Sequence, residues 1–253
     1  VAAAKVMREK ATTIASTEAT MDIVGTGGDG VGTFNISTAS AFVVAGCGVP
    51  VAKHGNKAVS SKSGAADVLS ALGIKLDCDF KLLKRALNEA NIAFLMAPRH
   101  HAAMRHVAPV RAALGVRTIF NMLGPLANPA LVKRILVGVY DRAFCVPFAH
   151  VLAQLGTKHA WVVHGADGLD EVSTTGPTYV AELKNNSVRE FTISPKDIGL
   201  PTAIVDDLIG GDGVHNANHL RKLLDGESGP YRDIVLFNAA AALLGGGHET
   251  SLQ

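Results

Sequence analysis

The sequence predicts an α/β fold in which a larger domain, built on a central and mostly parallel sheet, is joined to a small helical domain. Apolar stretches of strand length alternate with helical patterns, and this alternation requires crossover connections that leave neighbouring strands parallel. Residues 99–129 show no strand pattern and contain Gly124-Pro125 and Asn128-Pro129, so we expect a helical excursion there. The predicted helical domain comprises residues 1–18 and 98–131, and the predicted α/β domain comprises residues 19–97 and 132–253.

Each element rests on a local pattern of apolar residues, caps and turn residues. Helical patterns cover residues 1–17, the stretch from Asn35 or Ser37 to Gly46, and residues 63–72, 79–91, 100–114, 143–155, 218–224 and 231–244. Strand patterns cover residues 21–24, 49–53, 92–96, 134–140, 160–164, 178–184 and 188–193. Asn185-Asn186 predicts a hairpin, and hence an antiparallel addition to the sheet, which the final helices should cover.

Composition excludes several classes of protein. The chain has 253 residues, of which 48% are hydrophobic and 18% charged, so it has the apolar surface for a sizeable core. A net charge of +2 gives no reason to expect a nucleic-acid or membrane partner. Three widely spaced cysteines fit neither a disulfide framework nor a C-x-x-C metal site, which favours a reducing compartment. With no signal-peptide or membrane-spanning pattern, we expect a cytoplasmic protein.

The strongest motif is DIVGTGGDGVGTFNIST, residues 22–38, in which a strand leads through a glycine-rich turn to a polar helix start. Glycines let the backbone approach a ligand and turn successive N–H groups toward it, and a helix N-terminus adds partial positive charge. The motif therefore predicts a site for phosphate or pyrophosphate. An ordinary tight turn is the alternative, which the number of glycines disfavours.

The same turn matches the dinucleotide pattern G-x-G-x-x-G through Gly25, Gly27 and Gly30. That pattern needs an acidic residue at the end of the next strand to hold the ribose, and here Lys53-His54 stand at that place. NAD binding is accordingly disfavoured. No Walker-type G-x-x-x-x-G-K-[ST] sequence occurs either.

A second motif, KHGNKAVSSKSGAAD, covers Lys53 to Asp67 at the end of the second predicted strand. Its lysines and serines supply the cations and hydroxyl donors that a polyanion requires. Such loops at strand ends line the ligand crevice of open α/β sheets, although a solvated polar loop is the plainer alternative. We expect this loop to lie beside the glycine-rich turn.

A third motif, HGADGLDE, covers His164 to Glu171 and again follows a predicted strand. The adjacent carboxylates Asp170 and Glu171 are oxygen ligands of the kind that Mg²⁺ prefers, and a magnesium ion would offset the charge of bound phosphates. An exposed acidic pair without a ligand is the alternative. The scattered histidines do not follow the H-E-x-x-H order of a zinc site.

Residues 203–211, AIVDDLIGG, look like the acidic strand and loop by which one large class of phosphoribosyltransferases holds ribose. Here Asp212 follows instead of small hydroxyl residues, and Pro201 disfavours a central strand. We assign this stretch a structural role.

These motifs, with HVAPVRAALGVRTIFNMLGPLANP at 106–129 and LIGGDGVHNA at 208–217, closely resemble the anthranilate phosphoribosyltransferase family, in the same order from about Met21 to the C-terminus. The resemblance implies a fold similar to that of the pyrimidine nucleoside phosphorylases. It also implies transfer of phosphoribose from phosphoribosyl pyrophosphate (PRPP) to anthranilate with Mg²⁺, an early step of tryptophan biosynthesis.

The resemblance also implies the site residues. PRPP would be bound by Gly25, Gly28, Asp29, Thr33, Asn35, Ile36, Ser37, Thr38, Lys53, His54, Gly55, Asn56, Lys57, Ala58, Val59, Ser60, Ser61 and Ala65. Anthranilate would contact Gly25, Asn56 and Arg111, whose planar guanidinium suits a carboxylate. Mg²⁺ would be held by Ser37, Asp170 and Glu171. Ala65 stands where the family often has serine, so weaker PRPP binding is expected at most.

The anthranilate amine is neutral at pH 7, so we expect no general acid or base, and instead electrostatic roles for Lys53 and Asp29. Family members usually carry further helices before the position of Val1 and a helical tail after that of Gln253. A homodimer is expected where the leading helices are present. A nucleic-acid-binding relative and a nucleoside phosphorylase are the alternatives, disfavoured by the low net charge and by the anthranilate motifs.

Overall fold

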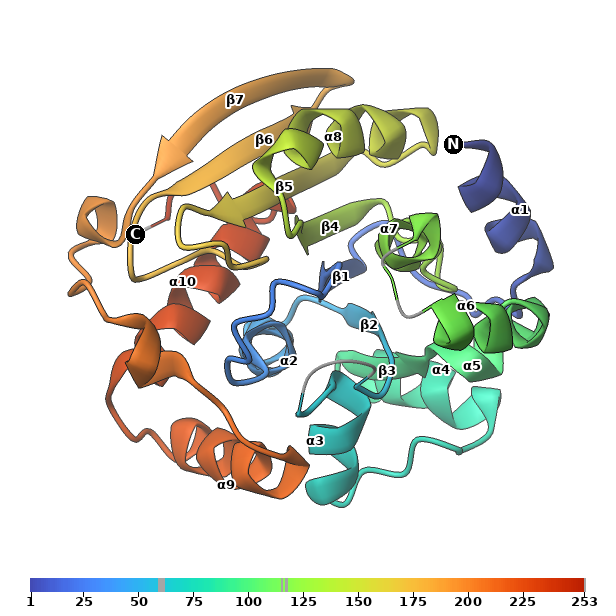
Figure 1. Cartoon of the computed structure of the whole chain (residues 1–253), viewed down its shortest axis with the longest axis horizontal. Coiled ribbons are helices and arrows are strands. Elements are labelled where there is room, and N and C mark those ends of the chain that lie inside the picture. Colours follow the sequence, from blue (N-terminus) through green and yellow to red (C-terminus); the bar gives the residue numbers. More distant parts are fainter. Residues whose placement is uncertain (59–61, 115, 117, 253) are drawn as a thin grey trace.

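The computed structural model describes residues 1–58, 62–114, 116 and 118–252. Within these residues seven strands form one sheet in the order β3-β2-β1-β4-β5-β6-β7 (Figure 1). The strands are β1 (Met21–Gly25), β2 (Val51–Gly55), β3 (Ile92–Met96), β4 (Arg134–Gly138), β5 (His159–Gly165), β6 (Thr178–Lys184) and β7 (Ser187–Ile193). The helices are α1 (Ala2–Lys10), α2 (Ile36–Gly46), α3 (Ala65–Ala71), α4 (Phe80–Glu89), α5 (Ala97–His100), α6 (Ala108–Leu114), α7 (Ile119–Leu126), α8 (Cys145–Gln154), α9 (Gly213–Leu224) and α10 (Pro230–Gly245).

Strands β1 to β5 run parallel, whereas β6 and β7 are antiparallel additions, which confirms the predicted fold class. The hairpin forms where predicted, with Asn185 and Asn186 at φ 52° and 59°. Both residues adopt the left-handed conformation that a two-residue turn needs and that asparagine tolerates. From β1 the chain builds the sheet first toward β2 and β3 and then toward β4 and β5. The point between β1 and β4 is therefore the topological switch point, where open α/β sheets bind ligands.

Strand residues alternate between the two faces of the sheet, as the two-residue period of a strand requires. Ile23, Leu136 and Trp161 pack beneath α2 and α10 on one face. Ile135 and Val162 pack against residues of α8 and α7 on the other face. Both faces of the parallel strands are thus covered, and the rim at their carboxyl ends is left for a site.

The segment between β3 and β4 forms helices, as predicted, and α1 packs against it through α7 and the 3₁₀ helix η1 (Ala102–His106). The prediction of a helix over 1–17 is wrong beyond Lys10. The backbone N–H groups of Thr12 and Ile14 donate to His100 and Pro129 carbonyls, so this stretch is extended along the helical segment rather than helical. These tertiary hydrogen bonds override the local helical pattern.

Other element boundaries differ from the sequence prediction. The predicted helix 100–114 is divided into the end of α5, η1 and α6. The second strand begins at Val51 rather than at 49, because the N–H of Val49 still donates to Val44 at the end of α2. Helix α9 begins at Gly213 rather than at 218, capped by the Asp212 carboxylate on the N–H of His215, and it packs on α3 rather than on the sheet. Among the described residues, no helix combines the length and the apolar character needed to cross a membrane.

Candidate functional site

The turn after β5 crosses directly over the carboxyl ends of β1 and β4. The Asp170 carboxylate accepts a hydrogen bond from the N–H of Gly27 at 2.6 Å. At Gly138, the last residue of β4, an added Cβ would lie only 1.6 Å from the carbonyl oxygen of Asp170, so no side chain fits there. The glycine-rich turn and the acidic pair, 143 residues apart in the chain, therefore share one corner of the switch point.

The acidic pair also reaches the start of α2. The Glu171 carboxylate accepts from the N–H of Ser37 at 3.1 Å, in the first turn of that helix. A negative charge is favourable at this position, because the first N–H groups of a helix have no partner inside it. In the glycine-rich turn, Gly27 and Gly28 adopt φ of 69° and 82°, a conformation that other residues rarely take.

Lys53 is the cation of this corner. Its side chain is only 3% exposed, and its ammonium donates to the carbonyl of Ile23 at 2.5 Å and to the hydroxyl of Ser37 at 3.2 Å. Burial lowers the pKa of Lys53, while the negative charges of Asp22, Glu171 and Asp170 raise it. The net direction is a lowered pKa, so burial outweighs the neighbouring carboxylates.

The carboxylates outnumber this cation. Burial and the charge of Asp29 raise the pKa of Asp170 to about 7, and burial and the charge of Asp170 raise that of Glu171 to about 8. Burial is the larger cause of each shift, and the neighbouring negative charge adds to it. Asp170 and Glu171 supply carboxylate oxygens of the kind that Mg²⁺ prefers. Among the described residues no three His, Cys, Asp or Glu side chains lie close enough together to hold a metal ion by themselves, so a Mg²⁺ ion here would also need oxygens from phosphate or water.

The second sequence motif lies beside the start of α2. Asp67 in α3 organises its backbone, because one carboxylate oxygen accepts from the N–H groups of Ala58 at 2.8 Å and Gly64 at 2.9 Å. Ser63 joins this loop to the first motif, since its hydroxyl donates to the side-chain oxygen of Asn35 at 3.2 Å. The two phosphate-type loops are therefore adjacent, as expected. Val59, Ser60 and Ser61, predicted as PRPP contacts, lie outside the described residues.

The remaining predicted PRPP residues lie along the same rim, and their roles stay predictions. Ile36 and Thr38 are buried on α2, where Thr38 also lines the pocket that Lys53 enters. His54 is buried, and Lys57 and Asn56 are exposed beyond the end of β2. Gly25, Gly28, Asp29, Thr33, Gly55, Ala58 and Ala65 are partly exposed around this edge.

The predicted anthranilate contacts come from two sides. Gly25 and Asn56 follow β1 and β2, whereas Arg111 belongs to α6 in the helical segment. The side chain of Arg111 lies outside the described part of the structure. The backbone of Asn56 is held by the N–H of Ala66, which donates to its carbonyl at 3.1 Å.

Sequence reasoning missed the link between the helical segment and the sheet. Asn128 is buried, and its amide donates to the Asp22 carboxylate at 2.7 Å and to the carbonyl of Ala52 at 2.8 Å. The other oxygen of Asp22 accepts from the N–H of His54 at 3.1 Å. Burial raises the pKa of Asp22 to about 6. An acid inside the apolar strand MDIVG was the only signal in the sequence for this link.

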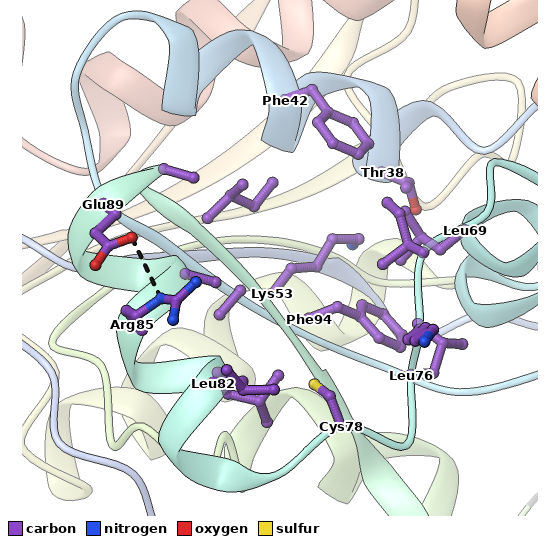
Figure 2. A pocket seen from close by; sticks show the side chains of 17 residues that line it. Thr38, Phe42, Lys53, Leu69, Leu76, Cys78, Leu82, Arg85, Glu89 and Phe94 are labelled. Carbon is purple, nitrogen blue, oxygen red and sulfur yellow. Dashed lines mark ion pairs between the residues drawn. The ribbon is translucent and has the colours of Figure 1, made fainter.

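A pocket of about 390 Å³ lies behind Lys53, at the edge of the sheet formed by β3. Figure 2 shows the Lys53 side chain crossing it, among Phe42, Leu69 and Phe94, with the Arg85–Glu89 ion pair at one side. Its lining is predominantly apolar. The pocket therefore offers the lysine stem an apolar environment and is not itself a phosphate site.

The stretch 203–211 forms no strand of the sheet. Val205–Leu208 is a 3₁₀ helix, and both Asp206 and Asp207 are exposed. The Asp207 carboxylate accepts from the N–H of Ile204 at 3.3 Å, which is a local turn contact. The structural role expected for these acids agrees with this arrangement.

Known proteins with similar sequences belong to the family that the sequence motifs resemble. Residues 17–253 match the model of the glycosyl transferase family, a/b domain. The chain is 59% identical over 252 residues to the anthranilate phosphoribosyltransferase of Parvibaculum lavamentivorans, covering 100% of this chain and 74% of that protein.

Solved structures are also similar. That of the anthranilate phosphoribosyltransferase from Thermus thermophilus matches with a TM-score of 0.93 at 44% identity, over 98% of this chain and 74% of that one. The Saccharomyces cerevisiae enzyme, solved in complex with PRPP and Mg, matches with a TM-score of 0.88 at 32% identity, over 99% of this chain and 71% of that one.

The switch point of this sheet brings together a glycine-rich turn, a buried lysine and paired carboxylates. Together with the family match, this arrangement defines the chain as a glycosyltransferase α/β domain. Within that class, the chain belongs to the anthranilate phosphoribosyltransferase family. This confirms the resemblance that the sequence motifs indicated.

Proposed function

We propose that this site transfers the phosphoribosyl group of PRPP to the amine of anthranilate and releases pyrophosphate, a reaction of tryptophan biosynthesis. Membership of the family supports the reaction. The observation that carries the assignment to this corner is the hydrogen bond between Gly27 and Asp170, which joins the phosphate-type turn to the acidic pair.

The diphosphate is assigned to the N–H groups of the glycine-rich turn, the start of α2 and the loop after β2. Lys53 stabilises the negative charge that develops on the departing pyrophosphate, because its buried ammonium is already held in place by Ser37 and Ile23. Asp29 and nearby backbone carbonyls tolerate the positive character of the ribosyl centre. This arrangement stabilises charge without a proton transfer.

Ser37, Asp170 and Glu171 are the residues proposed to hold Mg²⁺. When bound there, the ion would neutralise diphosphate charge as a Lewis acid. The chain's own contribution is a fixed set of oxygens, since Asp170 and Glu171 are each anchored by a backbone N–H, from Gly27 and Ser37 respectively.

Anthranilate is proposed to lie between the sheet rim and the helical segment, with Asn56 and Arg111 as its contacts. A guanidinium can hold a carboxylate through two hydrogen bonds, which would aim the ortho amine at the ribosyl C1. No general base is assigned, because the aromatic amine is already neutral.

We also propose the domain division at residues 1–18 and 98–131 against 19–97 and 132–253, a cytoplasmic location and a homodimer. The exposed apolar side chains of Val6, Val110, Leu114 and Ile119 on α1, α6 and α7 support an interface on the helical segment. Light scattering of a chain that includes the leading helices would test the dimer.

The experiment is a fluorescence assay of anthranilate consumption with PRPP, run with and without Mg²⁺. Consumption that depends on both PRPP and Mg²⁺ supports the proposal. Parallel incubation with thymidine and phosphate tests the nucleoside phosphorylase alternative. Thymine release without anthranilate consumption would overturn the proposed function.

A further inference from the structure

The segment 208–217, LIGGDGVHNA, lies against the glycine-rich turn rather than in the site itself. The N–H of Phe34 donates to the carbonyl of Leu208 at 2.9 Å, and the N–H of Gly210 donates to that of Gly32 at 3.0 Å. A Cβ at Gly210 would lie 2.9 Å from the nitrogen of Phe34 and from the carbonyl oxygen of Thr33, which explains the glycine. The segment therefore packs backbone to backbone on the phosphate-type turn.

The same segment also contacts the second phosphate-type loop. At Gly213 a Cβ would lie 3.0 Å from the carbonyl group of Asp67, the residue whose carboxylate holds Ala58 and Gly64. Helix α9 packs along α3 from this point. One segment thus touches both loops to which we assign the diphosphate.

A single buried asparagine at the start of α9 makes the polar connection. Asn216 is only 1% exposed. Its side-chain oxygen accepts from the N–H of Gly211 at 2.8 Å, and its side-chain nitrogen donates to the oxygen of Asn35 at 2.9 Å. Since a backbone N–H can only donate, it fixes which end of the Asn216 amide faces it.

The orientation of the Asn216 amide in turn determines which end of the Asn35 amide faces it. With the Asn216 nitrogen facing it, Asn35 must present its oxygen, and the Ser63 hydroxyl donates to the same oxygen at 3.2 Å. The Asn35 nitrogen then points the other way and donates to the carbonyl of Ser63 at 3.3 Å. Asn35 stands at the N-cap position of α2 but its side chain makes no cap bond with that helix, so its orientation comes from these partners.

We propose that Asn216 is a positioning residue for the diphosphate site, because its hydrogen bond to the Asn35 oxygen, together with the Ser63 carbonyl that accepts from the Asn35 nitrogen, makes Asn35 offer a donor, not an acceptor, to the bound anion. This inference rests on the proposed function, in which Asn35 contacts PRPP. A phosphate oxygen needs donors, and an amide turned the wrong way would place a carbonyl oxygen against it.

The test is a double-mutant cycle in which PRPP affinity is measured by calorimetry with Mg²⁺ and KM by the anthranilate assay. Asn216→Asp keeps the acceptor for Gly211 but sets an oxygen against the Asn35 oxygen, so Asn35 can satisfy either residue 216 or the Ser63 carbonyl but not both and should lose its fixed orientation. We expect Kd and KM for PRPP to rise about tenfold, because one hydrogen bond to a charged group is lost. The KM for anthranilate should not change. Asn218→Asp, an exposed residue on the same helix, is the matched control and should change neither constant.

The cycle separates positioning from added charge or damaged packing. In an Asn35→Ala background, Asn216→Asp should have no further effect on PRPP affinity, because it acts through Asn35. An equal rise in both backgrounds, or no rise in either, would overturn the inference. Should Asn216→Asp not fold, the uncharged Asn216→Ser enters the same cycle.

Failure of the proposed function gives a different result. A wild-type chain that binds PRPP but consumes no anthranilate overturns the transferase proposal alone. The double-mutant cycle is then evaluated from the Kd for PRPP, which needs no turnover. A wild-type chain that binds no PRPP overturns both proposals.

Discussion

At the scale of single residues, the proposed site is built from titratable groups whose pKa values are shifted by burial. Lys53 is 3% exposed, and its pKa is lowered by burial. Desolvation and neighbouring negative charges raise the pKa values of Asp170, which is buried, and of Glu171, which is partly exposed. The sequence motifs singled out these residues as candidates, since glycines, lysines and acids at strand ends have few structural reasons to occur together, and their roles stay predictions.

Lys53→Met tests the role of the buried cation. Methionine has a similar length and is apolar, so the fold should tolerate it, but the charge on departing pyrophosphate would lose its fixed partner. We expect kcat/KM for PRPP to fall by about 10²-fold, as for loss of one preorganised donor. Steady-state kinetics would measure this, with the exposed Lys75→Met as control. Unchanged kcat/KM would show that Lys53 is structural.

At the scale of elements, glycines and side-chain caps bring the loops together. The strands and the hairpin were predictable, because apolar runs and turn residues are local signals. The contacts of Asp22 with Asn128, and of Asn35 with Asn216, were not, because each joins residues that only tertiary packing brings together. The end of the first helix at Lys10 was missed for the same reason.

Gly138→Ala tests the close approach of the acidic turn to β4. Since the added Cβ would lie 1.6 Å from the Asp170 carbonyl oxygen, the turn must move away from Gly27. In thermal unfolding, we expect Mg²⁺ with PRPP to raise the Tm of the wild type but not that of Gly138→Ala. Overpacking should also lower stability by about 1–3 kcal/mol. Gly176→Ala, where a Cβ meets nothing within 4 Å, is the control. A full ligand-induced shift in Gly138→Ala would contradict this account.

The junction of β2 with the helical segment should respond to pH. Burial, with the nearby charges of His101, His100 and Lys53, lowers the pKa of His54 to about 3, while its ring contacts the carbonyl of Gly124 at 3.1 Å. In the unfolded chain this histidine titrates near its ordinary value. The unfolded state therefore binds more protons between pH 6.5 and pH 3, and stability falls as pH drops through that range.

His54→Asn should remove this part of the pH dependence. Urea unfolding of the wild type should lose about 2 kcal/mol between pH 7 and pH 5 from His54 alone, and the variant should show a correspondingly smaller loss. Asp22, whose pKa is raised to about 6, works in the opposite direction and is present in both proteins. Equal losses in the two proteins would show that His54 is not responsible.

At the scale of the whole molecule, the sheet order decides what the site can do. Because β1 lies between β2 and β4, the loops after β1, β2 and β5 meet around one rim, and the helical segment stands beside it (Figure 1). The sequence predicted this convergence from the alternation of strands and helices. It could not predict which backbone groups touch, because that depends on the twist and packing of the complete sheet.

The most direct test of the account is calorimetry of PRPP binding, with and without Mg²⁺, to the wild type and to a variant carrying both Asp170→Asn and Glu171→Gln. We predict that Mg²⁺ strengthens PRPP binding to the wild type and that the double substitution abolishes this effect. Turnover of anthranilate should lose its magnesium dependence in parallel. Retention of both in the double variant would contradict the claim that the acidic turn and the glycine-rich turn hold one ligand together.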